Sequence, residues 1–247
     1  MVCLVSLLAP IPLLLLLPEE GGPSGLSRLQ QLGLSATCYT SNPLLALFPL
    51  LLVMILFMGP LVEASMRGVL AGFSSWDLER DPLIVARTLL VAPLTEEWVF
   101  RCCCIPLLVF AGCSHSLTVA LTCTLFGLVH AHHSWRPLLQ GVPWRSIAAQ
   151  VIFQCAYTSL FGGIMAHAYL LCGSFLGVAA AHTFANFMGF PSLRFGMDPM
   201  AVCYPVRWWI WGCYGVGIAG FAWALLGGGY QWLFKVVGAP VCALTRG

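Results

Sequence analysis

The sequence predicts an all-α fold in which seven or eight helices form a polytopic bundle across a membrane. The first observation is composition: the chain of 247 residues is 60% hydrophobic, and its mean hydropathy is +0.90. The second is the length of the apolar runs, about twenty residues, which a helix needs to cross roughly 30 Å of hydrocarbon. The third is the absence of period-two alternation, which argues against strands, since an open sheet edge in lipid leaves backbone groups unpaired.

The N-terminal part holds one apolar run and one polar connection. The run "VCLVSLLAPIPLLLLL" has neither the Lys or Arg of a signal-peptide n-region nor a clear cleavage site, so we expect a retained helix at about 2–17. The Gly- and Ser-rich segment that follows it is the one long polar connection. We expect a single integral-membrane domain, 1–247, made of a divergent N-terminal helix and loop (1–42), a core that carries the motifs (43–200) and C-terminal helices (201–247).

The other helices follow from the remaining apolar runs, at about 43–62, 83–110, 115–132, 147–171, 174–190, 208–226 and 230–244. The turns near 111–114 and 172–173 hold no Lys or Arg. The alternate loops hold three pairs of arginines, Arg67 with Arg80, Arg136 with Arg145, and Arg194 with Arg207. By the positive-inside rule these basic loops face the cytosol. The net charge of +2 suggests no nucleic-acid partner.

Twelve cysteines could form a disulfide framework by count alone. Most of them lie inside apolar runs, none forms a CxxC pair, and the run Cys102, Cys103, Cys104 would fan around a helix. We therefore expect small buried hydrophobic residues and no disulfide or zinc site.

The stretch "TEEWVFR" places three ionisable side chains in an otherwise apolar run. Glu97 and Arg101 are four residues apart and share a helix face, whereas Glu96 points away from both. In the simplest interpretation, Thr95 caps a helix and the two acids complement its dipole at an exposed end. Against this, Glu96 lies nine residues beyond Arg87, which at about 1.5 Å per residue is near mid-membrane. A carboxylate there indicates function.

Two further motifs add polar groups at compatible depths. "FGLVHAHH" places Phe126 and His130 four residues apart, and "AAAHTFANFMGF" does the same for His182 and Asn186. We expect the other histidines of this region to lie in an interfacial loop (His132, His133) or to serve helix packing (His167).

These groups suit water-mediated hydrolysis of a peptide or ester bond. Glu96 can act as a general base, His130 can orient the same water or shuttle its proton, and His182 with Asn186 offers two donors to an oxyanion. The chain has neither a GxSxG elbow nor an HExxH zinc box. A metal site built from Glu96, His130 and His182 remains chemically feasible.

The segments "EEWVFR", "FGLVHAHH" and "HTFAN" resemble, in order and spacing, the EExxxR, FxxxH and HxxxN signatures of the CAAX prenyl protease 2 family, the Ras-converting endopeptidases. The resemblance covers about residues 43–200. It implies a multi-pass endopeptidase of the endoplasmic reticulum membrane, with an intramembrane catalytic cavity open to the cytosol. Such an enzyme removes the last three residues of farnesylated or geranylgeranylated CaaX proteins, for example Ras-like GTPases, in contact with membrane lipid.

The resemblance also implies residue roles. Glu96 and His130 would activate water, His182 and Asn186 would hold the oxyanion, and the supporting residues would be Glu97, Arg101 and Phe126. It implies a glutamate-type enzyme without metal or cofactor. Members usually have an additional N-terminal helix, which this chain is expected to lack.

Two kinds of alternative remain. The EExxxR superfamily includes other membrane hydrolases and proteins proposed to act as non-proteolytic scaffolds. A transporter or lipid-binding protein would also place charges inside a bundle, but a transporter should show paired broken helices or an internal repeat. Neither is visible in the sequence.

Overall fold

The computed structural model describes residues 26–67, 81–191, 193–226, 228–238 and 242–244, with single positions at 8, 10, 11 and 16. The expected helix at 2–17 therefore lies largely outside the described residues, as does Arg80. Within the described ranges all regular elements are helical and no strand occurs, which confirms the all-α class. The chain divides into two compact units, one of Met1–Pro43, Glu96–Phe175 and Pro240–Gly247, the other of Leu44–Thr95 and Leu176–Ala239. Whether they form one domain stays a prediction.

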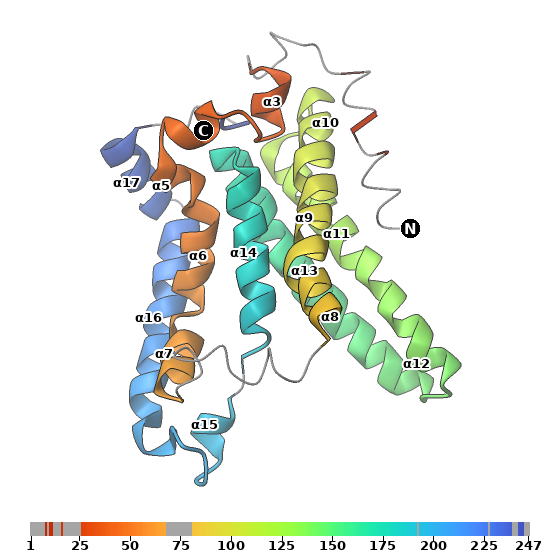
Figure 1. Ribbon diagram of the computed structural model, residues 1–247, viewed down its shortest axis with the longest axis vertical. Coiled ribbons are helices and arrows are strands. Elements are labelled where there is room, and N and C mark those ends of the chain that lie inside the picture. The colour runs from red at the N-terminus through yellow and green to blue at the C-terminus, as the bar shows by residue number, and fades with distance from the viewer. Residues whose placement is uncertain are drawn as a thin grey trace. The chain divides into compact units, whose positions relative to one another are not determined.

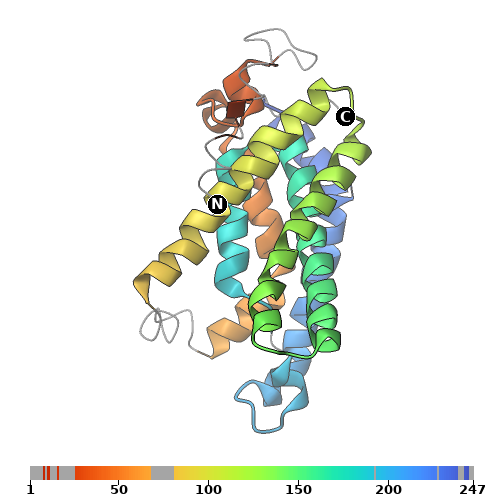
Figure 2. The same ribbon diagram turned by 90° about the vertical axis from the view of Figure 1, so that its right-hand side faces the viewer.

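The first unit is built on two long helices, α11 (His115–Val129) and α13 (Trp144–Cys172), which lie side by side and antiparallel (Figures 1 and 2). Between them run a short 3-10 helix, η3 (His130–Ser134), and α12 (Trp135–Leu139). Gly127 allows the close approach, because a Cβ there would lie 1.9 Å from the Ser159 hydroxyl oxygen. Small residues bring membrane helices together in this way. Two further short helices, α3 (Arg28–Gln31) and α4 (Thr37–Thr40), precede them in the chain.

The charged motif lies in a run of helical elements from Pro82 to Phe110. It comprises α8 (Pro82–Ala86), the π-helical η1 (Arg87–Val91), α9 (Ala92–Glu97), the π-helical η2 (Trp98–Cys104) and α10 (Ile105–Phe110). The run starts at Asp81, whose carboxylate accepts from Leu83 N–H at 2.9 Å. Thr95 lies in its interior and donates to the Val91 carbonyl at 2.8 Å. The interpretation of Thr95 as a helix cap is therefore wrong.

The second unit packs α16 (Arg207–Leu225) against α6 (Phe48–Leu56) and α7 (Met58–Met66). Its other helices are α14 (Phe175–Met188), α15 (Arg194–Met197), η4 (Tyr204–Val206) and α17 (Gly228–Val237), and α5 (Pro43–Ala46) begins at its boundary. The expected single helix over 43–62 is instead bent by 65° between α6 and α7. Pro60 explains the break, because it has no N–H to offer the Leu56 carbonyl.

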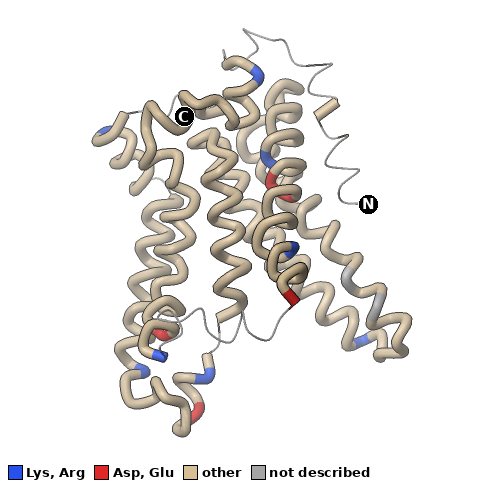
Figure 3. Tube along the Cα trace, viewed as in Figure 1, with Lys and Arg blue, Asp and Glu red and all other residues tan. Residues whose placement is uncertain are grey.

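By length and composition, the described residues contain fewer candidate membrane spans than the sequence predicts for the chain. Among the described residues, α13 alone is long and apolar enough to cross a membrane. Two bent pairs, α6 with α7 and the segment Tyr204–Leu225 with α17, raise the total to three if each is one span. The chain is a membrane protein, and its seven or eight spans stay a prediction. Figure 3 shows few charged positions, mostly near helix ends, with a further group along the α8–α10 run.

One cysteine pair departs from the expectation. Cys38 and Cys242, 204 residues apart in sequence, form a disulfide with a Cα–Cα distance of 5.5 Å. It joins the segment after α3 to residues that follow α17, next to the C-terminal end of α13, where Leu244 N–H donates to the Leu170 carbonyl at 3.0 Å. The expectation of no disulfide is wrong for this pair. It holds for Cys102 and Cys103, which are buried free thiols.

Candidate active site

Glu97 and Arg101 form the buried ion pair that their spacing predicts. Arg101 Nε lies 3.0 Å from Glu97 Oε2, and the two side chains are 1% and 0% exposed. Glu97 ends α9 and Arg101 lies one turn later in η2. A charge buried this deeply requires an opposite charge beside it, because its desolvation is otherwise too costly. The pair therefore belongs to the interior of the first unit.

Phe126 completes the surroundings of Arg101. Its ring lies under the guanidinium, with Cζ at 4.5 Å from the ring centroid, and Phe100 meets the same ring edge-on. Arg101 Nη2 also donates to the Gly162 carbonyl at 3.2 Å. Gly162 must be small, since a Cβ there would lie 3.0 Å from the Phe126 ring. The three expected supporting residues, Glu97, Arg101 and Phe126, thus lie together.

Glu96 and His130 also lie together, on the same unit. Glu96 Oε2 is 3.8 Å from His130 Nε2, and the side chains are 28% and 14% exposed. Glu96 therefore differs from its neighbour Glu97 in being accessible. A separation of 3.8 Å is too long for a direct hydrogen bond and lies within the reach of one bridging water.

The backbone fixes the proton on His130. Its Nδ1 lies 2.6 Å from the Phe126 carbonyl oxygen, which can only accept, so Nδ1 must carry the hydrogen. In the neutral ring the lone pair is then on Nε2, the atom that faces Glu96. His130 sits where α11 passes into η3, a change of helix type that positions this ring.

His182 and Asn186 lie one turn apart on α14, in the second unit. His182 is buried and Asn186 is half-buried. The Asn186 side-chain amide donates to the Thr88 carbonyl at 3.0 Å. One turn earlier, the hydroxyl of Thr183 donates to the Leu89 carbonyl at 2.8 Å.

Pro93 explains why those two carbonyls need partners from α14. Pro93 has no N–H, so it cannot donate to Leu89, four residues before it, in an α-helix. In an α-helix the Thr88 carbonyl would accept from Ala92 N–H, but in the π turn Ala92 N–H donates to the Arg87 carbonyl instead. In a π-helix the Thr88 carbonyl would accept from residue 93, which is Pro93 and has no N–H. Side chains of α14 therefore donate to two carbonyls that have lost their α-helical backbone donors in the helix leading into Glu96.

Thr183 is the site residue that the sequence pattern did not single out. A Pro inside an apolar helix is a visible sign of unsatisfied carbonyls, but it does not say which distant hydroxyl reaches them. Among the other histidines, His167 Nδ1 lies 2.8 Å from His115 Nε2, which agrees with a packing role. His132 Nδ1 contacts the Val129 carbonyl at 2.5 Å. In the described part of the chain, no group of three His, Cys, Asp or Glu side chains could hold a metal ion.

The chain resembles one family throughout the region of these motifs. Residues 78–188 match the family described as type II CAAX prenyl endopeptidase Rce1-like. The chain is 35% identical over 208 residues to the CAAX prenyl protease 2 of Homo sapiens, which covers 78% of this chain and 60% of the relative. It is 31% identical over 231 residues to that of Rattus norvegicus, covering 89% and 65%. A probable CAAX prenyl protease 2 of Schizosaccharomyces pombe is 38% identical over 112 residues, covering 44% and 41%.

No solved structure matches the chain. The matched segment contains all seven residues that the sequence assigns to the site. The protein is a helical membrane protein. Over residues 78–188 the chain belongs to the Rce1-like family of type II CAAX prenyl endopeptidases. It spans about 60–65% of the length of the human and rat relatives.

Proposed function

We propose that the chain is an intramembrane endopeptidase that removes the C-terminal tripeptide from prenylated CaaX proteins. The observation that carries the proposal is the pairing of an accessible carboxylate with a histidine of fixed tautomer, Glu96 Oε2 at 3.8 Å from His130 Nε2. The relatives' names support the substrate class. They do not identify which prenylated proteins are cut, and Ras-like GTPases remain the proposed substrates.

A water molecule between Glu96 and His130 would donate one hydrogen to each. Its oxygen then keeps a lone pair for attack on the scissile carbonyl carbon, while Glu96 takes the first proton as general base. When the tetrahedral intermediate breaks, that proton passes to the leaving nitrogen. The products are the carboxylic acid of the prenylated cysteine, which keeps the second hydrogen of the water until it ionises, and the free amine of the tripeptide. His130 is suited to this role because its Nε2 lone pair points at the same place.

For His182 and Asn186 we propose donation of N–H groups to the oxyanion. An asparagine amide has two N–H donors, and the contact with Thr88 uses one of them. Asn186 can therefore hold the backbone and contact substrate with the same side chain. Glu97 and Arg101 act as positioning residues, because their ion pair fixes the turn that follows Glu96.

The proposed class is a glutamate protease without a metal. The donors near Glu96 suit proton transfer, since a carboxylate and an imidazole 3.8 Å apart leave room for one bridging water, and the chain has no HExxH zinc box. A chelator-resistant activity is therefore the expected behaviour.

The proposed location is the endoplasmic reticulum membrane, with the site open to the cytosol. In the first unit, Arg145 lies at the beginning of α13, and the Cys38–Cys242 disulfide lies near its other end. A helix of 29 residues is about 43 Å long, enough to separate two compartments. Positive charge favours the cytosol and a disulfide favours an oxidising compartment such as the lumen of the reticulum. The two signals agree on one orientation.

The prenyl group explains how a protein tail could reach such a site. Each buried CH₂ contributes about 0.8 kcal/mol, so a prenyl chain anchors the modified cysteine at the bilayer. The scissile bond follows that cysteine directly. Without the lipid, the tail has no reason to leave water.

The test uses the full chain in proteoliposomes and a farnesylated CaaX peptide, with the same peptide lacking the farnesyl group as control. We expect cleavage between the farnesylated cysteine and the next residue, little cleavage of the control, and no loss of rate with a strong chelator. Equal kcat/KM for the two peptides would contradict the substrate class. Activity lost with the chelator and restored by zinc would instead make Glu96 and His130 metal ligands. If the protein is folded and cleaves neither peptide, the result would favour the alternative that the chain is a non-proteolytic scaffold.

A further inference from the structure

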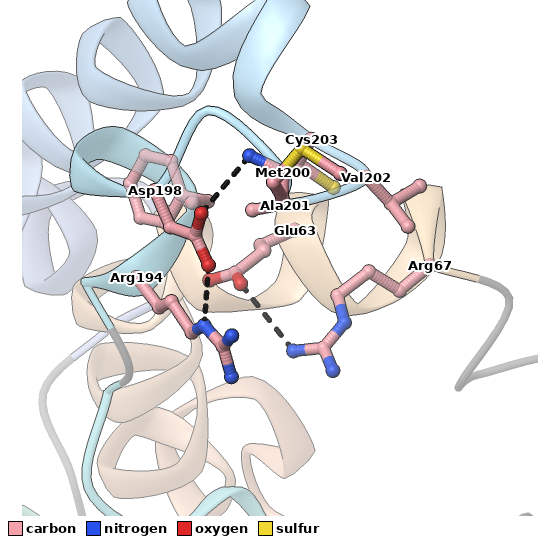
Figure 4. Close-up of a pocket in the computed structure, with 9 residues that line it drawn as sticks. Glu63, Arg67, Arg194, Asp198, Met200, Ala201, Val202 and Cys203 are labelled. Carbon is pink, nitrogen blue, oxygen red and sulfur yellow. Dashed lines mark hydrogen bonds and ion pairs between the residues drawn. The ribbon is translucent and has the colours of Figure 1, made fainter.

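A pocket in the second unit carries a set of charges that the proposed reaction does not use. It has a volume of about 340 Å³ and lies between the end of α7 and the segment from α15 to η4 (Figure 4). Its charged lining residues are Glu63, Arg67, Arg194 and Asp198. The volume falls at the lower end of the range of small-molecule pockets.

The floor of the pocket is a packed apolar cluster. Phe195, Cys203 and Ile210 are buried there, with Trp211 and Tyr214 packed against them. The rings of Phe195 and Tyr214 are stacked, with centroids 5.8 Å apart. The apolar base of the pocket is therefore formed by α15, α16 and the residue before η4.

The four charged side chains form two ion pairs around the opening. Arg67 Nη1 lies 3.5 Å from Glu63 Oε1, and Arg194 Nε lies 2.8 Å from Asp198 Oδ2. Figure 4 shows the guanidinium ends of both arginines on the side of the pocket that the Glu63 carboxylate also faces. The formal charges of the four side chains sum to zero. A ligand that complements them carries one negative and one positive group.

The rim of the pocket is apolar and exposed. Met200 and Val202 are 89% and 79% exposed. Two exposed tryptophans, Trp208 and Trp209, follow Arg207 at the start of α16. Exposed tryptophans and arginines close together in sequence are typical of the level where lipid headgroups meet acyl chains.

We propose that this pocket binds the headgroup of phosphatidylethanolamine. The lipid phosphate is bound by the guanidinium groups of Arg67 and Arg194, and its ammonium donates to the carboxylate of Glu63. The acyl chains run past Met200 and Val202. A primary ammonium has three N–H donors for a carboxylate, whereas the trimethylammonium of phosphatidylcholine has none. Phosphatidylglycerol lacks the ammonium and brings net negative charge toward two carboxylates.

The test is lipid binding by the purified full chain in detergent, counted by native mass spectrometry during titration with phosphatidylethanolamine, phosphatidylcholine or phosphatidylglycerol. We expect one saturable site with phosphatidylethanolamine bound about tenfold more tightly than either other lipid. Arg67→Gln and Arg194→Gln should each weaken that site about tenfold. Arg145→Gln, at an exposed arginine of the other unit, is the matched control and should change nothing.

Three results would overturn the proposal. Equal affinity for the three lipids would mean unselective coating by lipid, and unchanged affinity in both variants would place the lipid elsewhere. If inorganic phosphate displaced the lipid at the same concentration at which the lipid fills the site, the pocket would be a site for a free anion. Arg194 is 78% exposed, so its replacement leaves the fold intact even if the Arg67 variant fails to fold. The readout is binding alone, so it does not depend on whether the chain is a peptidase.

Discussion

The two units contain acid–arginine pairs with the same spacing and different burial. In the first unit, Glu97 and Arg101 are four residues apart and sealed from solvent. In the second, Arg194 and Asp198 are also four residues apart, at a comparable distance of 2.8 Å, but lie at the surface. Glu63 with Arg67 is intermediate, with a buried acid and an arginine that is 52% exposed. Spacing along a helix therefore predicts which side chains meet. It does not predict how much their contact contributes to stability.

The burial of each ion pair determines how much the pair contributes to stability. Water and salt screen an exposed pair, and many such pairs contribute little to stability. A buried pair gains more from attraction but has also lost the hydration of both ions, so its net contribution is small until one partner is removed. Arg101 then depends on Glu97, on the Gly162 carbonyl and on the ring of Phe126 together. The buried pair is a rigid support, and the exposed pairs are available to a ligand.

The largest effect on turnover is expected at the acid beside the buried pair. Glu96→Gln keeps the size of the side chain and removes its basicity, so the rate of peptide cleavage should fall by about 10²- to 10⁴-fold with no change in unfolding temperature. Glu20→Gln makes the same change in the polar connection after the N-terminal apolar run, outside the proposed catalytic and lipid-binding residues, and should leave the rate near that of the unchanged chain. Rates are measured on the farnesylated peptide. An active Glu96→Gln variant would remove Glu96 from its proposed role.

The largest effect on stability is expected at the buried pair itself. Arg101→Met leaves the Glu97 carboxylate buried without its counter-ion, which should lower the free energy of unfolding by about 3–5 kcal/mol. The double variant Glu97→Leu with Arg101→Met removes both charges and should recover most of that loss. Unfolding of the purified protein in detergent, followed with denaturant, measures both. If the double variant were as unstable as the single one, packing and not charge would explain the loss.

A neutral contact should have a smaller effect. Thr183→Val removes the hydroxyl that donates to the Leu89 carbonyl and should cost about 0.5–1.5 kcal/mol. Thr183→Ser should restore most of it. Thr158→Val is the matched control, because the Thr158 hydroxyl donates to the Gln154 carbonyl of its own helix. Hydrogen exchange of the segment 88–95 should accelerate in Thr183→Val only. Equal protection in Thr183→Val and the unchanged chain would show that the Leu89 carbonyl needs no partner from α14.

Much of the fold follows from local sequence. Among the described residues, the apolar runs from 43 onward are helical over most of their length, because a run of this length can satisfy its backbone in lipid only as a helix. The short helices α3, α4, α15 and η4 lie in the connections and were not predicted. The ion pair of Glu97 with Arg101 follows from their four-residue spacing. The bend between α6 and α7 was also open to prediction, since Pro60 interrupts the apolar run over 43–62.

The features that the sequence pattern missed depend on residues far apart in the chain. The disulfide joins Cys38 to Cys242, and no local pattern links positions 204 residues apart. Thr183 meets Leu89 across 94 residues, and a threonine in an apolar helix more often bonds to its own backbone. The fixed tautomer of His130 depends on a backbone carbonyl, which every residue has. Such contacts are set by tertiary packing.

The smallest effect is expected at the exposed pair, and it should depend on pH. The Met200 N–H and the Arg194 guanidinium both donate to Asp198, which lowers the pKa of that carboxyl below its ordinary value. A lowered pKa means that the folded loop favours the carboxylate, so its contribution is complete above the ordinary pKa of about 4 and is lost as the pH falls through the lowered value. Between pH 5 and 7 we therefore expect no change of stability with pH, and Arg194→Gln, which removes one of the two donors, should lower the unfolding temperature at pH 7 only slightly, because an exposed pair contributes little. Below about pH 4, amide exchange at Met200 should accelerate in the unchanged chain. Asp198→Asn has no proton to gain in this range, and the same acid response in that variant would assign the effect to another group.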